Sequence, residues 1–400
     1  MNRKQIVWAA VIFPLTAAVS LDRTVMAVAA PFVQKEFGFS LMEMSIIITS
    51  LFFTYSGLNW LSGVVVDRLG VRISLAAAAL WWSVFTGLTP LGNSFAGLLV
   101  LRLLVGAGQA PDWPASLRSI VETFPKNEYG KGNSILLGGL YLGPIIGAPL
   151  TIWIITTLGW RSAFYIFAVA GGLLALVWYA VYRDNPRAIE EKRTVPVSWK
   201  AVAKSGRAWI LGVQAFCYVV VMSFFVSWLP TYLLNSRGFS LRNVAYGATF
   251  PYIALFIMVF VAGKLQDVVY QRTGSAYLAR VPFAIVGFLL SSSLLIAASL
   301  VTDASILIVC LTLSLGALGL VSVSIWSSCA NMGGSSAGAL TGWTNMWANL
   351  ANALGPIFTA FITGLTGSWA MGIMVLGITG LLGAVLWLFV HPERPINIEV

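Results

Sequence analysis

Charged residues are scarce in this sequence. They make up 10% of the 400 residues, whereas 58% of the residues are hydrophobic. A soluble domain usually carries about 25% charged residues, so the composition excludes an ordinary soluble protein and places most of the chain in lipid. The 16 Trp and 38 Gly agree with this, because Trp anchors helix ends at the membrane interface and Gly lets helices approach closely.

Histidine and cysteine are also rare. The single histidine, His391, lies near the C-terminal end, which excludes a histidine relay within the membrane. Cys217, Cys310 and Cys329 all lie in apolar runs, so we expect no disulfide framework. The sequence shows neither a P-loop nor a metal-ligand cluster, so we expect no cofactor, no metal and no ATP-driven cycle. An integral-membrane enzyme would need a base, a nucleophile or a metal near the interface, and we therefore expect a protein that is not an enzyme.

Twelve apolar runs are long enough to cross about 30 Å of hydrocarbon as helices. A polar, basic segment at 183–208 separates the first six runs from the last six. The pattern predicts an all-α membrane protein with an N-terminal six-helix bundle at 1–182, a linker at 183–208 and a C-terminal six-helix bundle at 209–400. The first run follows M-N-R-K without a small-residue cleavage site, which indicates a retained helix rather than a signal peptide. The runs lie near 6–29, 43–66, 73–91, 95–122, 131–156, 160–182, 209–235, 242–263, 280–300, 303–327, 338–364 and 368–390.

The distribution of Lys and Arg predicts the orientation. With both termini in the cytoplasm, 17 of the 24 basic residues lie on the inner side and 4 on the outer side. This asymmetry assigns the net charge of +10 to orientation and contact with lipid headgroups. We therefore expect membrane lipid as a partner and no nucleic acid.

Two inner loops repeat one pattern. G-V-V-V-D-R-L-G-V-R at 63–72 follows the second run, and G-K-L-Q-D-V-V-Y-Q-R-T-G at 263–274 follows the eighth. Equivalent loops in two six-helix halves indicate an internal repeat, as in transporters that bind their substrate near the membrane midplane.

The loop at 63–72 resembles the signature of the major facilitator superfamily between its second and third helices. The resemblance implies that a set of loop residues forms charge contacts at an inner gate, namely Gly63, Asp67, Arg68, Gly70 and Arg72, with Asp267 and Arg272 in the second copy. Three further stretches resemble the anion:cation symporter family, whose bacterial members take up sugar acids and other organic acids. They are L-D-R-T-V-M-A-V-A-A-P at 21–31, L-R-L-L-V-G-A-G-Q-A-P-D-W-P at 101–114 and S-W-L-P-T-Y-L-L-N-S-R-G-F-S at 227–240.

The narrower resemblance implies a function as well as a fold. It implies proton-coupled import of a small organic anion by alternating access, with rocking of the two halves. It also implies a location in the bacterial cytoplasmic membrane, and we expect the chain to function as a monomer.

Four charged residues lie within the apolar runs of the first half: Asp22, Arg23, Arg102 and Asp112. An ionisable group in hydrocarbon costs about 2.5–3.5 kcal/mol on insertion scales, so embedded charges are functional candidates. A guanidinium group stays charged and binds a carboxylate bidentately, so Arg23 and Arg102 favour an organic anion. Structural pairing with Asp22 and Asp112 is the alternative. Two embedded cations favour a monocarboxylate.

The proton site is less well defined. The resemblance implies a proton-coupling role for Asp22 and a glutamate seven residues after the arginine of the fourth helix. This sequence has Gln109 at that position. Its side chain lies on the same helical face as Arg102, but it cannot titrate. Asp112 either takes over this proton site or caps a helix beside Pro111. A uniporter or exchanger of organic anions therefore stays open as an alternative.

Neutral polar residues complete the predicted site. Tyr55 and Asn345 match substrate-contact positions of the family. Asn345 and Asn349 share one helical face with Thr341 and Asn352, spaced at 341, 345, 349 and 352. Ser324 and Trp326 on the tenth run are further candidates. Each has a packing alternative, because polar side chains also hold helices together and Trp anchors at interfaces.

Overall fold

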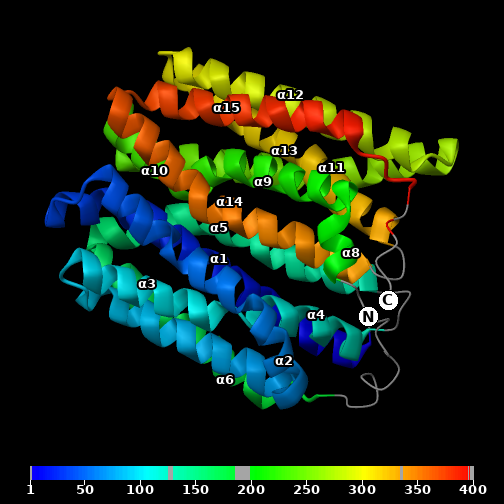
Figure 1. Ribbon diagram of the computed structural model, residues 1–400. Helices are drawn as coiled ribbons and strands as arrows, with labels where there is room; N and C mark the ends of the chain where they lie inside the picture. Colours follow the sequence, from blue (N-terminus) through cyan, green and yellow to red (C-terminus); the bar gives the residue numbers. More distant parts are fainter. Residues whose placement is uncertain (1, 125–128, 185–198, 334–336, 395, 397–400) are drawn as a thin grey trace. The chain divides into compact units, whose positions relative to one another are not determined.

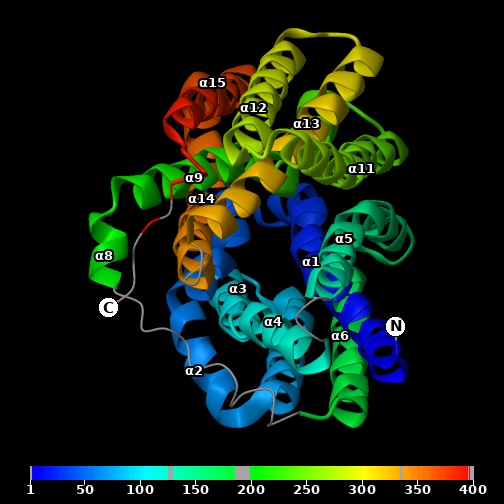
Figure 2. The same cartoon turned by 90° about the vertical axis from the view of Figure 1, so that its right-hand side faces the viewer.

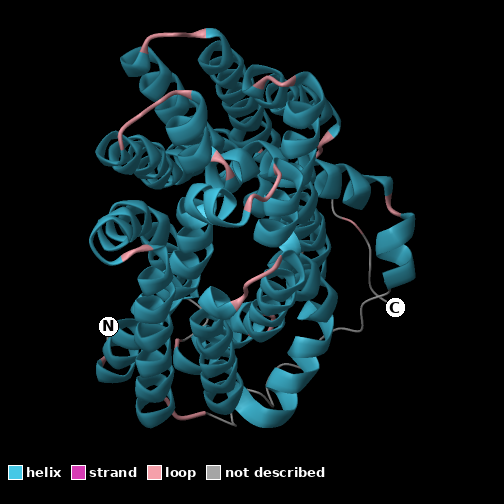
Figure 3. Ribbon diagram, turned by 90° about the vertical axis from the view of Figure 1, so that its left-hand side faces the viewer, coloured by secondary structure: helices cyan, strands magenta, loops and turns pink. Residues whose placement is uncertain are grey.

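The computed structural model describes residues 2–124, 129–184, 199–333, 337–394 and 396, and within these ranges not the side chains of 59–61, 63, 64, 67, 121, 129–131, 133, 134, 199–201, 330 and 337–339. In the described residues every regular element is a helix, and Figure 3 shows helices joined by loops without a strand. The chain divides into two compact units, residues 1–193 with 239–245 and residues 194–238 with 246–400.

Within its described residues, the first unit holds six α-helices and one short 3-10 helix (Figure 1). They are α1 (Arg3–Phe37), α2 (Leu41–Leu88), η1 (Thr89–Leu91), α3 (Phe95–Gln109), α4 (Asp112–Thr123), α5 (Tyr129–Leu158) and α6 (Trp160–Val181). Side chains cap the first two helices: Asn2 and Gln5 form a capping box at α1, and Ser40 and Glu43 form one at α2.

Helix α2 contains both the second and the third predicted runs. Gly70 divides it into two arms, because its φ of 79° and ψ of 166° are not helical. This backbone region is accessible essentially only to glycine. Each arm is long and apolar enough to cross a membrane, over Leu41–Leu58 and Arg68–Leu91.

The fourth predicted run, 95–122, is interrupted. Helix α3 ends at Gln109 and α4 begins at Asp112, with Pro111 at its N-cap. Neither helix reaches 18 residues, and the described part of the chain has 11 helices that are long and apolar enough to span. The predicted all-α membrane fold is confirmed, whereas the count of twelve spans stays a prediction.

Glycines let the helices of the first unit approach closely. Gly139 and Gly143 of α5 face α1, where a Cβ at Gly139 would lie 2.1 Å from Thr16 Oγ1. On α3, a Cβ at Gly106 would lie 2.0 Å from the carbonyl oxygen of Leu51 on α2. Figure 2 shows α1 beside α5. These contacts hold α1 and α3, which contain three of the four embedded charges, against their neighbours.

The second unit is also helical. It contains α8 (Trp199–Lys204), α9 (Gly206–Ser227), α10 (Leu229–Thr231), the π-helix η3 (Tyr232–Ser236), α11 (Leu241–Thr273), α12 (Ala276–Leu300), α13 (Ala304–Gly333), α14 (Ala337–Thr366), α15 (Trp369–Leu386) and η5 (Trp387–Phe389). The first residues of α11 belong to the first unit. Helix α9 packs on α14, and α12 packs on α13 and α15. All three cysteines are free and buried. The predicted linker lies partly outside the described residues, so the domain boundaries stay a prediction.

Candidate functional site

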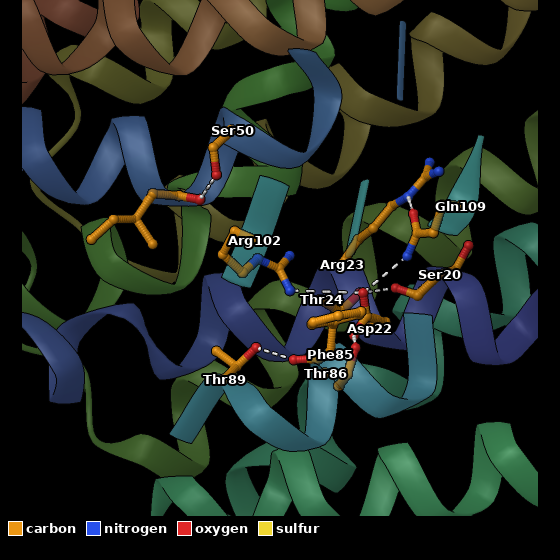
Figure 4. A network of polar contacts seen from close by, with 11 residues as sticks. Ser20, Asp22, Arg23, Thr24, Ser50, Phe85, Thr86, Thr89, Arg102 and Gln109 are labelled. Atoms are coloured by element: carbon orange, nitrogen blue, oxygen red, sulfur yellow. Dashed lines mark hydrogen bonds and ion pairs between the residues drawn. The ribbon is translucent and has the colours of Figure 1, made fainter. Parts of the chain in front are cut away.

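Asp22 is the centre of a buried polar network in the first unit (Figure 4). Its side chain lies on α1 and the residue is 3% exposed. Thr86 Oγ1 on α2 donates a hydrogen bond to Asp22 Oδ1. Gln109 Nε2 on α3 donates to Asp22 Oδ2 at 3.0 Å. Three helices thus meet at one carboxylate.

Arg102 on α3 is the closest cation to this carboxylate in the network. Its NH1 lies 3.8 Å from Asp22 Oδ2, and the residue is 0% exposed. Among the described residues, no acceptor forms a hydrogen bond with Nε, NH1 or NH2 of Arg102. A buried guanidinium group ordinarily has its donors filled, because an unfilled buried donor costs about 1–3 kcal/mol or more when charged. Asp22 therefore neutralises part of the charge of the Arg102 guanidinium group, while its N–H donors can still bind further acceptors.

Gln109 joins the second arginine to the same network. Arg23 Nε donates to Gln109 Oε1 at 3.2 Å, while the amide nitrogen of Gln109 donates to Asp22. The Arg23 guanidinium carbon lies 5.5 Å from the ring centroid of Phe52 and 5.4 Å from that of Tyr55. These distances are typical of cation–π contacts, which hold the cation in place without neutralising it.

The connected network carries an excess of positive charge. Asp22 supplies one carboxylate, and Arg23 and Arg102 supply two guanidinium groups. Asp112 is 7% exposed at the first turn of α4, and its Oδ1 forms no hydrogen bond among the described residues. The hydrogen bonds and ion pair that join the other residues do not include Asp112. The structure thus brings together Asp22, Arg23, Tyr55, Arg102 and Gln109.

The predicted residues of the second half have different surroundings within the second unit. Asn349 on α14 is 9% exposed and donates to the backbone oxygen of Asn345 at 2.9 Å. Ser324 is 0% exposed, and its hydroxyl bonds to Gln266 and to the backbone oxygen of Arg280, which is the packing alternative considered above. Trp326 is 37% exposed.

The signature loop is tied to the end of α6. Asp184 Oδ1 accepts a hydrogen bond from the backbone N–H of Arg72 at 2.9 Å. Arg72 Nε donates to the carbonyl oxygen of Tyr179 at 2.7 Å, and its guanidinium group lies over the Tyr179 ring at 4.1 Å. Gly70 makes this possible, because a Cβ there would lie 2.7 Å from Asp184 Oδ2.

The other predicted gate residues are exposed, not described, or paired with a different residue. Arg68 is exposed, the side chain of Asp67 is not among those described, and Gly63 has no side chain. In the second unit Asp267 lies 3.5 Å from Arg280 NH2, while Arg272 is exposed. The observed ion pair of Asp267 is therefore with a residue that the loop pattern did not indicate.

Sequence reasoning missed two partners. Thr86 is a neutral residue in an apolar run, and its polar hydroxyl is the only feature that distinguishes it from its neighbours in the sequence. Asp184 lies in the polar segment after the sixth run, which indicated a linker rather than a contact. No group of three or more His, Cys, Asp or Glu in the described part of the chain is placed to hold a metal ion.

The chain is similar to known proteins in both sequence and fold. The sequence profile described as Major Facilitator Superfamily matches residues 12–356. A bacterial homologue of the human lysosomal transporter Spinster, solved in an inward-facing and occupied conformation, superposes with a TM-score of 0.81 at 17% identity, over 97% of each chain.

Three curated bacterial relatives match over most of their length. The probable sulfoacetate transporter of Cupriavidus necator is 27% identical, with 93% of this chain and 90% of the relative covered. The hexuronate transporter of Bacillus subtilis is 27% identical, with 89% and 87% covered. The D-galactonate transporter of Escherichia coli O6:H1 is 24% identical, with 97% and 95% covered.

Proposed function

The chain belongs to the major facilitator superfamily, and from this premise we propose that it imports a small organic anion in symport with protons by alternating access. The family and the relatives are transporters, so the chain is a multi-pass integral membrane transporter and not an enzyme. The proposed substrate is a sugar acid or another monocarboxylate. We propose the bacterial cytoplasmic membrane as the location, with both termini in the cytoplasm and a monomer as the functional unit.

The observation that carries the proposal is the buried guanidinium group of Arg102. Its donors have no hydrogen-bond acceptor in the described residues, and its ion pair with Asp22 is long at 3.8 Å. A carboxylate would supply two acceptor oxygens and one negative charge to this group. Relatives named for sulfoacetate, hexuronate and D-galactonate carry anions of this class.

The remaining polar residues would orient the substrate. Arg23 is held against Tyr55 and Gln109, so its remaining donors are available for a second anionic or hydroxyl oxygen. From the second unit we propose Asn345 and Asn349 as neutral contacts. For Ser324 the hydrogen bonds to Gln266 and Arg280 support a packing role, and Trp326 remains a candidate for contact with a ring or polyol.

Asp22 is the proposed proton carrier. Because the substrate carboxylate and Asp22 would share Arg102, protonation of Asp22 would free the guanidinium group for the substrate. Proton and anion binding would then favour each other, as thermodynamic linkage requires of coupled transport. Asp112, buried with one unfilled oxygen, is the second proton candidate. Gln109 cannot titrate, and it favours the second candidate function, a uniporter or exchanger of organic anions.

Counterflow in proteoliposomes tests the substrate class. The panel is sulfoacetate, hexuronates, D-galactonate and short monocarboxylates, and we expect at least one to exchange. Loss of a charged hydrogen-bond partner costs about 1.5–3 kcal/mol, so Arg102→Gln should weaken the apparent affinity by about 10-fold or more. Arg242→Gln removes an exposed charge and serves as the matched control. Absence of exchange for every acid, or unchanged affinity in Arg102→Gln, would contradict the proposal.

A further inference from the structure

A groove in the first unit lies apart from the Asp22 network. It has a volume of about 520 Å³ and is lined by the first turns of α1, the end of α4 and the end of α6. Figure 2 shows the N-terminal end of α1 beside α6. Lys4 at the groove and Asp22 are 18 residues apart on α1, which is about 27 Å at a rise of about 1.5 Å per residue. The groove is therefore not part of the candidate substrate site.

Three cations line the groove: Arg3, Lys4 and Arg183. All three are exposed. Of the described residues that line it, none is acidic. Lys4 Nζ donates to the backbone oxygen of Glu122 at 3.2 Å, and Arg183 NH1 donates to the backbone oxygens of Tyr179 and Tyr182. These contacts hold the cations in place without cancelling their charge.

The buried acid Glu122, whose backbone oxygen accepts from Lys4, is paired with a cation of its own. Glu122 lies 3.2 Å from Arg118 Nε and accepts a hydrogen bond from the Tyr182 hydroxyl at 2.8 Å. Burial and the Glu122 carboxylate raise the pKa of Tyr182 above its ordinary value, so the hydroxyl stays neutral. Asp184, whose charge also acts on Tyr182, accepts a hydrogen bond from the backbone N–H of Arg72. One such carboxylate beside three cations leaves the groove with a net positive charge.

The wall of the groove is apolar. Val7 and Val181 are 39% and 42% exposed, and the buried Trp8 and Trp178 also line the groove. Trp178 is 0% exposed and stacks on Tyr182 at 4.3 Å. Its indole N–H is buried without a hydrogen-bond acceptor among the described residues. The groove thus combines a cationic rim, an apolar wall and one unfilled donor.

We propose that this groove binds an anionic phospholipid of the inner leaflet. The phosphate group would lie among Arg3, Lys4 and Arg183, and an acyl chain would lie along Val7 and Val181. Basic pockets between transmembrane helices on the cytoplasmic side suit anionic headgroups. The charges select the anionic lipid, and the apolar wall distinguishes a lipid from a free phosphate ion.

Native mass spectrometry of the purified full chain tests the proposal. Phosphatidylglycerol is titrated against phosphatidylcholine with the wild type and with a variant that combines Arg3→Gln, Lys4→Gln and Arg183→Gln. A cation near an anionic lipid contributes roughly fivefold in affinity, so we expect the loss of all three to weaken phosphatidylglycerol binding by about 100-fold. The matched control combines Lys204→Gln, Lys264→Gln and Arg394→Gln, which removes three exposed cations outside the groove.

A second variant separates the site from general surface charge. Val7→Trp fills the exposed apolar wall and keeps all three cations, so we expect it to lose the tightly bound phosphatidylglycerol without a change in net charge. Equal losses in the groove variant and the charge-matched control would overturn the proposal. Equal binding of the two lipids, unchanged binding in Val7→Trp, or displacement of the lipid by millimolar inorganic phosphate would overturn it as well.

Discussion

Replacing Asp22 by asparagine removes the only carboxylate of the hydrogen-bonded network. The substitution keeps the shape of the side chain but only one acceptor oxygen, which can accept from Gln109 Nε2 while the new amide nitrogen donates to Thr86 Oγ1. The main loss is then the charge opposite Arg102. At 3.8 Å and an effective dielectric constant of about 20, the ion pair is worth about 4 kcal/mol. Breaking a buried ion pair at one partner typically costs about 3–5 kcal/mol, because the other charge is left uncompensated.

The expected effect is large enough for thermal unfolding. A loss of 1 kcal/mol lowers the melting temperature by about 2–4 °C in a domain of 150–250 residues, so Asp22→Asn should melt roughly 10 °C below the wild type. A thiol-reactive dye reports the transition, because Cys217, Cys310 and Cys329 are all buried in the folded protein. The double variant Asp22→Asn with Arg102→Gln should melt above Asp22→Asn, since it no longer leaves the buried Arg102 guanidinium group without Asp22.

The same melting assay tests whether the substrate binds at Arg102. A carboxylate bound at Arg102 replaces the missing negative charge, so the transported anion should raise the melting temperature of Asp22→Asn more than that of the wild type. The reasoning would be refuted if Asp22→Asn melted within about 2 °C of the wild type. The reasoning would also be refuted if the double variant lost more melting temperature than the two single variants lose when their losses are added.

Three further predictions follow from single contacts. Gln109→Glu places a second carboxylate where the amide now donates to Asp22 at 3.0 Å. Two carboxylates so close cannot both ionise, so we expect substrate uptake to depend more steeply on the pH gradient. An unchanged dependence on the gradient would argue against this proton site. Gly70→Ala should cost about 1–3 kcal/mol, because alanine disfavours this backbone region and its Cβ would displace Asp184; Gly172→Ala, with open space at its Cβ, is the control in the same melting assay. Hydrogen bonds from Ser275 Oγ and the Tyr277 backbone N–H hold the pKa of the exposed Glu393 below its usual value, so this contact is present above the unfolded pKa and is lost as the pH falls through the folded pKa. Ser275→Ala should shift the acid loss of amide-exchange protection at Tyr277 to higher pH, and an identical profile in both proteins would refute this.

The helices and the charged network were largely predictable. Apolar runs are long in lipid-embedded helices, and embedded charges are few, so Asp22, Arg23 and Arg102 stood out without any structure. The spacing of seven residues correctly placed Gln109 on the side of Arg102, because two helical turns return a side chain to nearly the same direction. The structure adds that Gln109 bridges Asp22 and Arg23.

Other features depend on contacts between distant segments. Thr86 is one of many polar residues in apolar runs, and only the packing of α2 on α1 selects it as a partner of Asp22. The apolar run at 95–122 predicted one helix, and its break at Ala110 was not resolved from the sequence, since a proline can bend a helix or end it. The role of Asp184 requires both the left-handed backbone at Gly70 and the end of α6, which are more than 100 residues apart.

Accumulation under an imposed pH gradient tests the central claim most directly. Proteoliposomes with an alkaline interior are loaded with no substrate and supplied with the acid that gives the strongest counterflow. Proton symport predicts uptake above the external concentration in the wild type, collapse of this uptake with a protonophore, and counterflow without accumulation in Asp22→Asn. Equilibration at the external concentration, unaffected by the gradient in the wild type, would contradict proton coupling and leave the uniporter or exchanger as the function.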